Sequence, residues 1–268
     1  MELPDWVPEG IDVTVPNAAR MYDYLLGGYH NFPVDREYSE RIEQVVPNAR
    51  QGACINRAFL GRVAEWLVGE RGIRQFLDIG SGIPTAGNVH EIAEEAAPGA
   101  RVMYVDIDPV AVAHTRAILS GNTRVGVVQM DLRCPMDITD HPDVTDLLDF
   151  SEPVAVMLVS VLHFISDDDD PYGIIAQLLD AVVAGSYIAL AHGTTVPELA
   201  EVLEASKQLY QRTPTPVYLR SREEIARLLT GLDIVEPGIV PITDWRPYPG
   251  ADASESWLSM LAAVGRKR

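Results

Sequence analysis

The sequence predicts an α/β protein built on a mostly parallel sheet. A buried strand ends in a glycine-rich turn at residues 75–82, strand and helix patterns alternate after it, and an aspartate ends each of three successive predicted strands. Parallel strands need helical crossovers, so this alternation is typical of a doubly wound sheet with both faces covered. Ligands of such sheets bind at the carboxyl ends of the strands.

Composition narrows the class of protein. The chain has 268 residues, and its hydrophobic content of 47% is enough for the packed core of one α/β domain, with or without an accessory piece. No apolar run reaches bilayer length and the N-terminus lacks a signal-peptide pattern, so we expect a cytoplasmic protein with no membrane partner. The net charge of −18 disfavours a nucleic-acid partner, which would need a basic face.

Neither the cysteines nor the acidic run predicts a metal site. Cys54 and Cys134 are isolated and lack the spacing of a zinc site or a disulfide framework, so we expect two ordinary buried thiols. The four aspartates at 167–170 precede Pro171 and are interpreted as the solvated start of a helix, which the helix dipole favours.

The residues before the first strand are predicted to form an extended arm and then helices. Asn17 is the expected N-cap of the first helix, a second follows Asp35, and a third covers residues 56–68. Because these helices precede the alternation of strands and helices, we assign residues 1–70 to an N-terminal arm and helical lid, and residues 71–268 to the α/β core.

Three side chains near the first helix are candidates for contact with a ligand. Arg20 and Tyr24 lie on one helix face, and the following turn at 29–33 contains His30. A structural interpretation stays open, with Tyr24 as a packing or capping residue and His30 as a surface histidine.

The glycine turn after the first strand indicates the kind of ligand. Gly80 and Gly82 would place backbone N–H groups against it. A dinucleotide fingerprint needs a third glycine where Thr85 stands, and the charge of Asp78 would face the pyrophosphate. A zwitterionic ligand with an ammonium group tolerates or uses this acid. S-adenosylmethionine (SAM) is such a ligand.

The second predicted strand, residues 101–105, also ends in acids. Asp106 comes directly off the strand and suits a bidentate hold on the two ribose hydroxyls of an adenosine. Asp108 stands before Pro109, a favoured first helical residue, and is interpreted as the N-cap of the next helix.

The third predicted strand, residues 125–130, ends in Asp131 and Leu132. Asp131 could accept a hydrogen bond from the adenine amino group, and Leu132 could offer a backbone N–H to the ring. The alternative is that Asp131 only begins a turn. Each acid alone is weak evidence, but the ordered set of Asp78, Asp106 and Asp131 is fairly specific for SAM.

The rest of the chain continues the alternation. A continuous apolar run with four valines predicts a central strand, which ends near Ser160 and is followed by His163. The expected elements are strands at 153–162 and 186–191, helices at 171–182, 198–210 and 221–229, and two closing apolar segments around 232–240 and 257–264.

Motifs along essentially the whole chain resemble the class I SAM-dependent methyltransferases. They are most similar to one actinobacterial family of S-adenosyl methyltransferases, formerly catalogued as a domain of unknown function. The closer match is carried by residues 19–28 (ARMYDYLLGG), 31–32, 35–36, 56–60 (NRAFL), 74–82 (RQFLDIGSG), 88–91 (NVHE), 104–109 (YVDIDP), 161–165 (VLHFI) and 245–247 (WRP).

This resemblance implies a Rossmann-like sheet of seven strands, the last one antiparallel, with a helical N-terminal lid over the cofactor. The superfamily pattern implies these cofactor positions: Asp78, Gly80 and Gly82 for the methionine part, Asp106 for the ribose, and Asp131 with Leu132 for the adenine. The chain departs from the family at two places. Tyr29-His30 stands where the family has Lys-Asp, which could alter the substrate, and Ile107 stands for an Asn beside the ribose acid.

SAM carries an activated methyl group, so a methyltransferase mainly has to align a nucleophile and exclude water. His163 and His30 are the candidate general bases, although His163 could instead be a structural histidine bonded to a backbone carbonyl. Arg20 is the candidate partner of the methionine carboxylate. Tyr24 and Ser160 complete the candidate cofactor site.

Three functional hypotheses remain open at this stage. The first is a SAM-dependent methyltransferase acting on a small molecule, with the acceptor atom and the oligomeric state unspecified. The second is a SAM- or adenosyl-binding regulatory or structural protein without catalysis. The third is an NAD-dependent oxidoreductase, which Asp78 and the missing third glycine disfavour.

Overall fold

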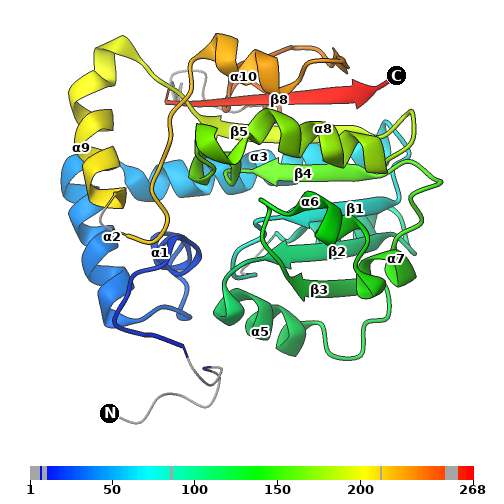
Figure 1. Ribbon diagram of the computed structural model, residues 1–268, viewed down its shortest axis with the longest axis horizontal. Helices are drawn as coiled ribbons and strands as arrows, with labels where there is room; N and C mark the ends of the chain where they lie inside the picture. The colour runs from blue at the N-terminus through cyan, green and yellow to red at the C-terminus, as the bar shows by residue number, and fades with distance from the viewer. Residues whose placement is uncertain (1–6, 8–10, 85–86, 212, 251–258) are drawn as a thin grey trace.

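One sheet organises the chain, and this computed structural model describes residues 7, 11–84, 87–211, 213–250 and 259–268 (Figure 1). Eight strands within those ranges form it, in the order β3–β2–β1–β4–β5–β8–β6, with β7 paired to β8. Strands β1 to β5 are parallel, and β8 is antiparallel to β5 and β6. The strands are β1 (Gln75–Ile79), β2 (Arg101–Asp106), β3 (Val125–Gln129), β4 (Ala155–Val159), β5 (Tyr187–Gly193), β6 (Leu232–Ile234), β7 (Val240–Pro241) and β8 (Met260–Lys267).

The predicted mostly parallel α/β sheet is therefore confirmed, including its seven principal strands and the antiparallel last one. The eighth strand, β7, has two residues. A segment this short carries no alternation of polar and apolar residues, so the sequence pattern does not reveal it.

Helices cover both faces of the sheet. Within the described ranges they are α1 (Ala18–Leu25), α2 (Pro33–Val45), α3 (Ala49–Gly69), α4 (Val89–Ala96), α5 (Pro109–Ile118), α6 (Pro135–Thr139), α7 (Pro142–Leu147), α8 (Pro171–Ala181), α9 (Ala200–Tyr210) and α10 (Arg222–Leu228). The short helices α6 and α7 were not predicted from the sequence. No helix in this described part of the chain is long and apolar enough to span a bilayer.

The central strand β1 shows how the two faces are packed. Successive side chains of a strand point to opposite faces. Phe76 belongs to the core on the side of α3, together with the buried Phe59. Leu77 and Ile79 belong to the core on the opposite side, together with Ile174 of α8. In Figure 1, α8 lies in front of the sheet and α3 behind it.

The N-terminal helices divide between two layers. Helix α3 packs on the sheet and shares its core, whereas α1 and α2 lie beside the sheet, where α9 packs against α2 (Figure 1). Phe32, at the start of α2, joins a small cluster with Ile83, Val110 and Ala111, which attaches these helices to the turn after β1 and to α5. The domain boundary near residue 70 and the lid stay predictions.

Helix caps follow the sequence signals. Asn17 caps α1 by accepting a hydrogen bond from the Ala19 N–H, and Asp108 caps α5 by accepting one from the Val110 N–H, as expected. Asp170 caps α8, in agreement with the helix-start interpretation of the acidic run.

Some boundaries differ from the prediction. Strand β4 ends at Val159 instead of continuing to 162, because Ser160 adopts a left-handed conformation with φ of +60° and the chain turns into a 3₁₀ segment, Leu162–Phe164. Helix α3 begins at Ala49, earlier than its clear apolar periodicity. The predicted last segment begins at Trp257, which lies outside the described residues; β8 begins at Met260.

The prediction of buried thiols is wrong. Both Cys54 and Cys134 are exposed. Cys54 lies on α3 with the exposed Ala58 and Glu65, on the face away from the sheet. Cys134 lies in the turn that starts α6.

Candidate cofactor-binding site

The glycine turn after β1 is fixed against the end of β2. The N–H groups of Gly80 and Ser81 both donate to the carbonyl oxygen of Val105, at 2.7 and 3.2 Å. Gly80 has φ of +74°, and a Cβ atom there would lie 2.4 Å from the Val161 side chain. Gly82 also has positive φ, +66°. Glycine is therefore required at Gly80 by both conformation and space.

Two buried carboxyls lie at neighbouring strand ends. Asp78 is near the end of β1, and Asp106 ends β2. Asp106 accepts hydrogen bonds from the Gly82 N–H at 2.7 Å and from the Asp108 N–H at 2.8 Å, so the turn after β1 and the turn after β2 are joined through this carboxylate. Each carboxylate oxygen can accept further bonds, such as those of a ribose diol.

Burial raises the pKa of both acids. Loss of solvent raises the pKa of Asp78 to about 7, with Arg57 opposing the shift and Asp106 adding to it. Loss of solvent likewise raises the pKa of Asp106 to about 6, against the hydrogen bonds from Asp108 and Gly82. A cationic ligand would therefore stabilise the ionised form of both carboxyls.

Arg57 lies at the candidate site, although the sequence analysis gave it no role there. It projects from α3 and lines one small cavity with Asp78, Ser81 and Gly82. The side-chain oxygen of Ser81 is buried and has no hydrogen-bond partner among the described residues. Arg57 belongs to the Asn56-Arg57 motif, which the sequence analysis noted as part of the family resemblance. Its position at the site follows only from the packing of α3 on the sheet.

A chain of hydrogen bonds connects α1, α3 and the end of β4. The Ser160 hydroxyl donates to the Asn56 side-chain oxygen at 2.7 Å, and the Asn56 amide donates to the Tyr22 hydroxyl at 3.0 Å. Tyr22 in turn donates to the Ala53 carbonyl. Ser160 is thus brought to the site with Tyr22. Tyr24, on another face of α1, donates to Glu40 instead.

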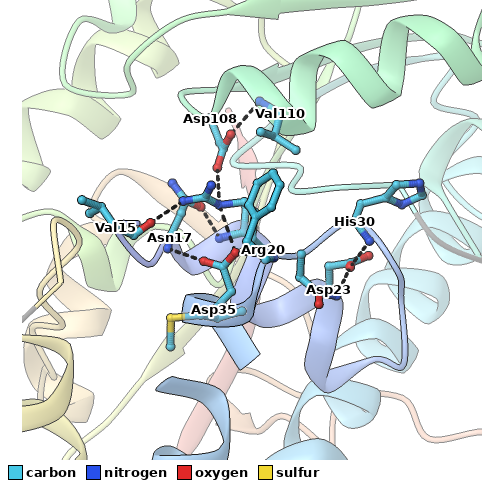
Figure 2. Close-up of polar contacts among 12 residues, drawn as sticks. Val15, Asn17, Arg20, Asp23, His30, Asp35, Asp108 and Val110 are labelled. Carbon is cyan, nitrogen blue, oxygen red and sulfur yellow. Dashed lines mark hydrogen bonds and ion pairs between the residues drawn. The ribbon is translucent and has the colours of Figure 1, made fainter. Parts of the chain in front are cut away.

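Arg20 lies at the junction of the N-terminal helices with α5 (Figure 2). Its guanidinium is buried and lies 3.5 Å from the Asp35 carboxylate and 3.6 Å from the Asp108 carboxylate. It also donates to the Val15 carbonyl at 2.7 Å and lies over the Phe32 ring. The structure therefore places Arg20 beside the turn that follows β2, with its charge matched by two acids.

The candidate adenine-binding residues follow β2 and β3. Asp131 forms a two-pronged ion pair with Arg133, whose hydrogen bonds and charge outweigh the effect of burial and hold the pKa of Asp131 below its usual range. Leu132 packs into the core. Ile107 is 49% exposed, which leaves an apolar surface next to Asp106.

The two candidate bases contact different parts of the molecule. His30 donates its backbone N–H to Asp23, and its ring lies 3.7 Å from the ring of His114 on α5. His163 lies in the 3₁₀ segment after β4, near His192. Burial lowers the pKa of His163 to about 3, and electrostatic interactions with His192 and Arg220 lower it further.

Arg220 holds the segment that carries His163. It is buried and donates to the carbonyls of Leu162 and Ile165 at 3.1 and 2.8 Å. His192 Nδ1 lies 2.7 Å from the Gly193 carbonyl, which can only accept, so this nitrogen carries the proton. The other nitrogen accepts from Arg220 at 2.9 Å. His192 is therefore neutral, in agreement with a pKa that burial lowers to about 4.

These features define a class of protein. A sheet of this order, a glycine turn after β1, and acids at the ends of β1 and β2 form the cofactor half of a Rossmann-like, SAM-dependent methyltransferase. The chain belongs to the S-adenosyl methyltransferase family, whose model matches residues 4–268. It is a methyltransferase, and SAM is its cofactor.

Solved structures agree with this assignment. A candidate methyltransferase from Thermobifida fusca YX is 37% identical, with 99% of this chain and 100% of that one covered and a TM-score of 0.93. A DUF574 family protein from Streptomyces avermitilis MA-4680 is 36% identical, with 96% and 99% covered and a TM-score of 0.89. Human N-acetylserotonin methyltransferase in complex with SAM is 15% identical over 92% of this chain and 62% of that one, with a TM-score of 0.50, and shares the fold. No curated protein matches the sequence.

Proposed function

We propose that the protein transfers the methyl group of SAM to a small-molecule acceptor, as an enzyme of class EC 2.1.1. Family membership supports methyl transfer. The observation that carries the proposal is the pairing of two buried carboxyls at adjacent strand ends with the Arg57 cation beside one of them. These charges suit a ligand that has both an amino-acid end and a ribose.

We assign the cofactor contacts by position. The turn formed by Gly80 and Gly82 faces the methionine part, and the space beside Gly82 is open. Asp106 accepts from the ribose hydroxyls, and Ser160 lies at the adjoining end of β4. Ile107 offers an apolar surface to the adenine. Leu132, through its backbone N–H, and Asp131 would complete the adenine contacts, and Asp131 would have to share its carboxylate with Arg133.

When bound, SAM supplies a methyl group already activated on a sulfonium. The protein's own contribution is then orientation and exclusion of water, which together lower a barrier by roughly 7–11 kcal/mol in favourable cases. A general base acts best when its pKa is near the working pH. Since the pKa of His163 is about 3, we assign it the role of a neutral hydrogen-bond acceptor for the methyl acceptor.

The net charge of −18 supports a small-molecule acceptor over a nucleic acid. The exposed thiols of Cys54 and Cys134 support a reducing, cytoplasmic environment, where free cysteines persist.

A thermal-shift measurement tests the cofactor assignment. The purified protein, freed of co-purified ligand, is melted with SAM, S-adenosylhomocysteine or NADH. At a hundredfold excess over Kd, a ligand specific for the folded state adds about 2.7 kcal/mol, roughly a 5–10 °C rise for a chain of this size. We expect that rise with both adenosyl ligands and none with NADH. A cooperative transition that neither adenosyl ligand shifts would contradict the proposal.

Catalysis is tested by the formation of S-adenosylhomocysteine from SAM with panels of small phenols, carboxylic acids and amines. Turnover with one of these classes supports methyl transfer. Tight SAM binding without turnover on any class would favour the non-catalytic alternative.

A further inference from the structure

We propose that the open edge of β3 is a docking site for an extended, basic segment of a partner protein, which joins the sheet as a further strand. β3 is an outer strand of the sheet and the lowest one in Figure 1. A groove lies along it between α5 and α7. No residue that lines this groove belongs to the candidate cofactor site, so the proposal is independent of the proposed function.

The outer side of β3 carries backbone groups without partners. Within the described ranges β3 pairs with β2 alone. The Arg124 carbonyl and the Met130 N–H both bond to β2, so the even-numbered residues direct their backbone groups to that strand. Because these directions alternate along a strand, the N–H and C=O groups of Val125 and Val127 point outward. They have no hydrogen-bond partner among the described residues, and an added strand would supply one.

The groove gives an added strand room on both faces of the sheet. Its volume is about 440 Å³, within the usual range of roughly 300–1,000 Å³ for ligand pockets. Leu119 and Val125 line it on the α5 side, and Met103 and Leu147 line it on the α7 side. A strand placed here would therefore find apolar contacts for side chains that point to either face.

The charges along the groove determine which segment fits. Helix α7 contributes Asp143 and Asp146, and α5 contributes Arg116; all three side chains are exposed. None of them forms an ion pair within the part of the chain that the structure describes. Basic side chains directed toward α7 would meet the two acids. The net charge of −18 also attracts a basic segment over longer distances.

A second copy of this chain fits the edge less well. Two β3 edges related by a two-fold axis would pair antiparallel, and the α7 helices of both copies would then lie on the same face of the joined sheet. The acids of one α7 would face the acids of the other. Like charges that face each other oppose association, and each copy already has a net charge of −18.

The two edges of the sheet are protected differently. Natural sheets protect exposed edges with short strands, charged side chains or proline. The opposite edge strand, β6, has three residues, and its Asp233 bonds to Arg268. β3 has five residues with the sequence VGVVQ, which contains no charge and no proline. β3 therefore has the features of a strand that receives a partner.

Fluorescence polarisation of the full chain with a labelled peptide tests the proposal. The probe is the acetylated and amidated peptide Lys-Val-Lys-Glu-Lys-Val-Lys, which as a strand presents its lysines on one face and its other side chains on the opposite face. We expect saturable binding. Two control peptides carry N-methyl groups, either on the lysines or on the other three residues. Only one of these sets of amides faces β3, so only one control should lose affinity, by about 10-fold or more.

Variants of the chain test the charges. Asp143→Asn combined with Asp146→Asn should weaken the peptide about 3–10-fold, as expected for the loss of two exposed ion pairs. Glu201→Gln combined with Glu204→Gln removes the same charge from exposed positions of α9 and is the matched control. Circular dichroism melts of both double variants check that they fold as wild type does.

Hydrogen exchange followed by NMR identifies the amides that the peptide covers. The outward N–H groups of Val125 and Val127 should exchange about 10-fold more slowly, or slower still, with saturating peptide. The amides of Gly126 and Val128, which point to β2, should change less.

Three results would overturn the proposal. Absence of saturable binding would show that the edge does not accept a strand. Equal binding of the probe and both N-methylated peptides would show attraction between charges alone. The third result is a wild-type chain that sediments as a dimer and becomes monomeric on Val125→Pro, which removes an outward N–H at the first residue of the strand. It would assign the edge to a second copy.

Discussion

Asp78 is a buried carboxyl whose ionisation opposes folding. Its folded-state pKa of about 7 lies above the reference value of 3.8, because burial disfavours the anion. Between these two values the folded protein binds more protons than the unfolded chain. The contribution of this group to stability is therefore fully present below about pH 3.8 and is lost as the pH rises to about 7.

Asp78→Asn should stabilise the ligand-free protein at pH 8, because the amide never has to ionise. The difference in unfolding free energy from wild type should shrink as the pH falls toward 4, by at most about 1.4 kcal/mol per pH unit. The difference in melting temperature should shrink with it. Calorimetry of ligand-free protein across this range measures it. Asp180→Asn, which makes the same substitution at an exposed position, is the control. A difference that does not change with pH would contradict the shifted pKa.

At the scale of elements, α1 and α2 are joined to α5 by one buried ion-pair cluster. Asp108 caps α5 and donates its own N–H to Asp106, so the Arg20 contact reaches the turn that follows β2 (Figure 2). Arg20 therefore couples the position of the N-terminal helices to Asp106, the proposed ribose contact.

Arg20→Met should destabilise the protein by about 3–5 kcal/mol, because it leaves Asp35 and Asp108 buried without their cation. Asp108→Asn should cost less, since asparagine also caps helices and Asp35 still pairs with Arg20. Urea unfolding of both variants measures the two losses. If Arg20→Met unfolds within about 1 kcal/mol of wild type, the cluster does not hold these elements together.

The elements that the sequence predicted well are those with local signals. Apolar runs placed the core of β1, β2 and β4, and side-chain caps placed the starts of α1 and α5. The end of β4 was missed because the left-handed turn at Ser160 is fixed by tertiary contacts, namely its bonds to Asn56 and to the Ala191 carbonyl. Residues other than glycine rarely adopt positive φ, so a serine in the sequence does not predict this conformation.

The site residues at the ends of strands could be predicted from the sequence. The site residues on the N-terminal helices could not. Asp78 and Asp106 are near their strand ends, and parallel strand ends meet at one edge. Arg57 and Arg20 both precede the sheet in the chain, and their sequence spacing does not say which one faces Asp78. That choice depends on the packing of α3 on the sheet, a long-range contact that a single sequence does not show.

At the scale of the whole molecule, α1, α2 and α9 form a layer beside the sheet (Figure 1). Helix α1 is connected to the candidate site through the hydrogen bond between Tyr22 and Asn56. This layer combines helices that are far apart in the sequence, and α9 contributes no buried residue. Few buried contacts favour local opening on short timescales. The cavity beside Arg57 has a volume of about 10 Å³, so a ligand with an amino-acid end needs the residues that line it to move apart.

We therefore predict that S-adenosylhomocysteine slows hydrogen exchange in α1, α2 and α9 together, because ligand binding favours the closed arrangement of that layer. Exchange followed by mass spectrometry, with and without saturating ligand, measures this peptide by peptide. Helix α7, which packs on β2 and β3, should be unchanged and serves as the internal control. Protection confined to the turns after β1 and β2 would show that the ligand enters through those turns alone, with α1, α2 and α9 remaining in place.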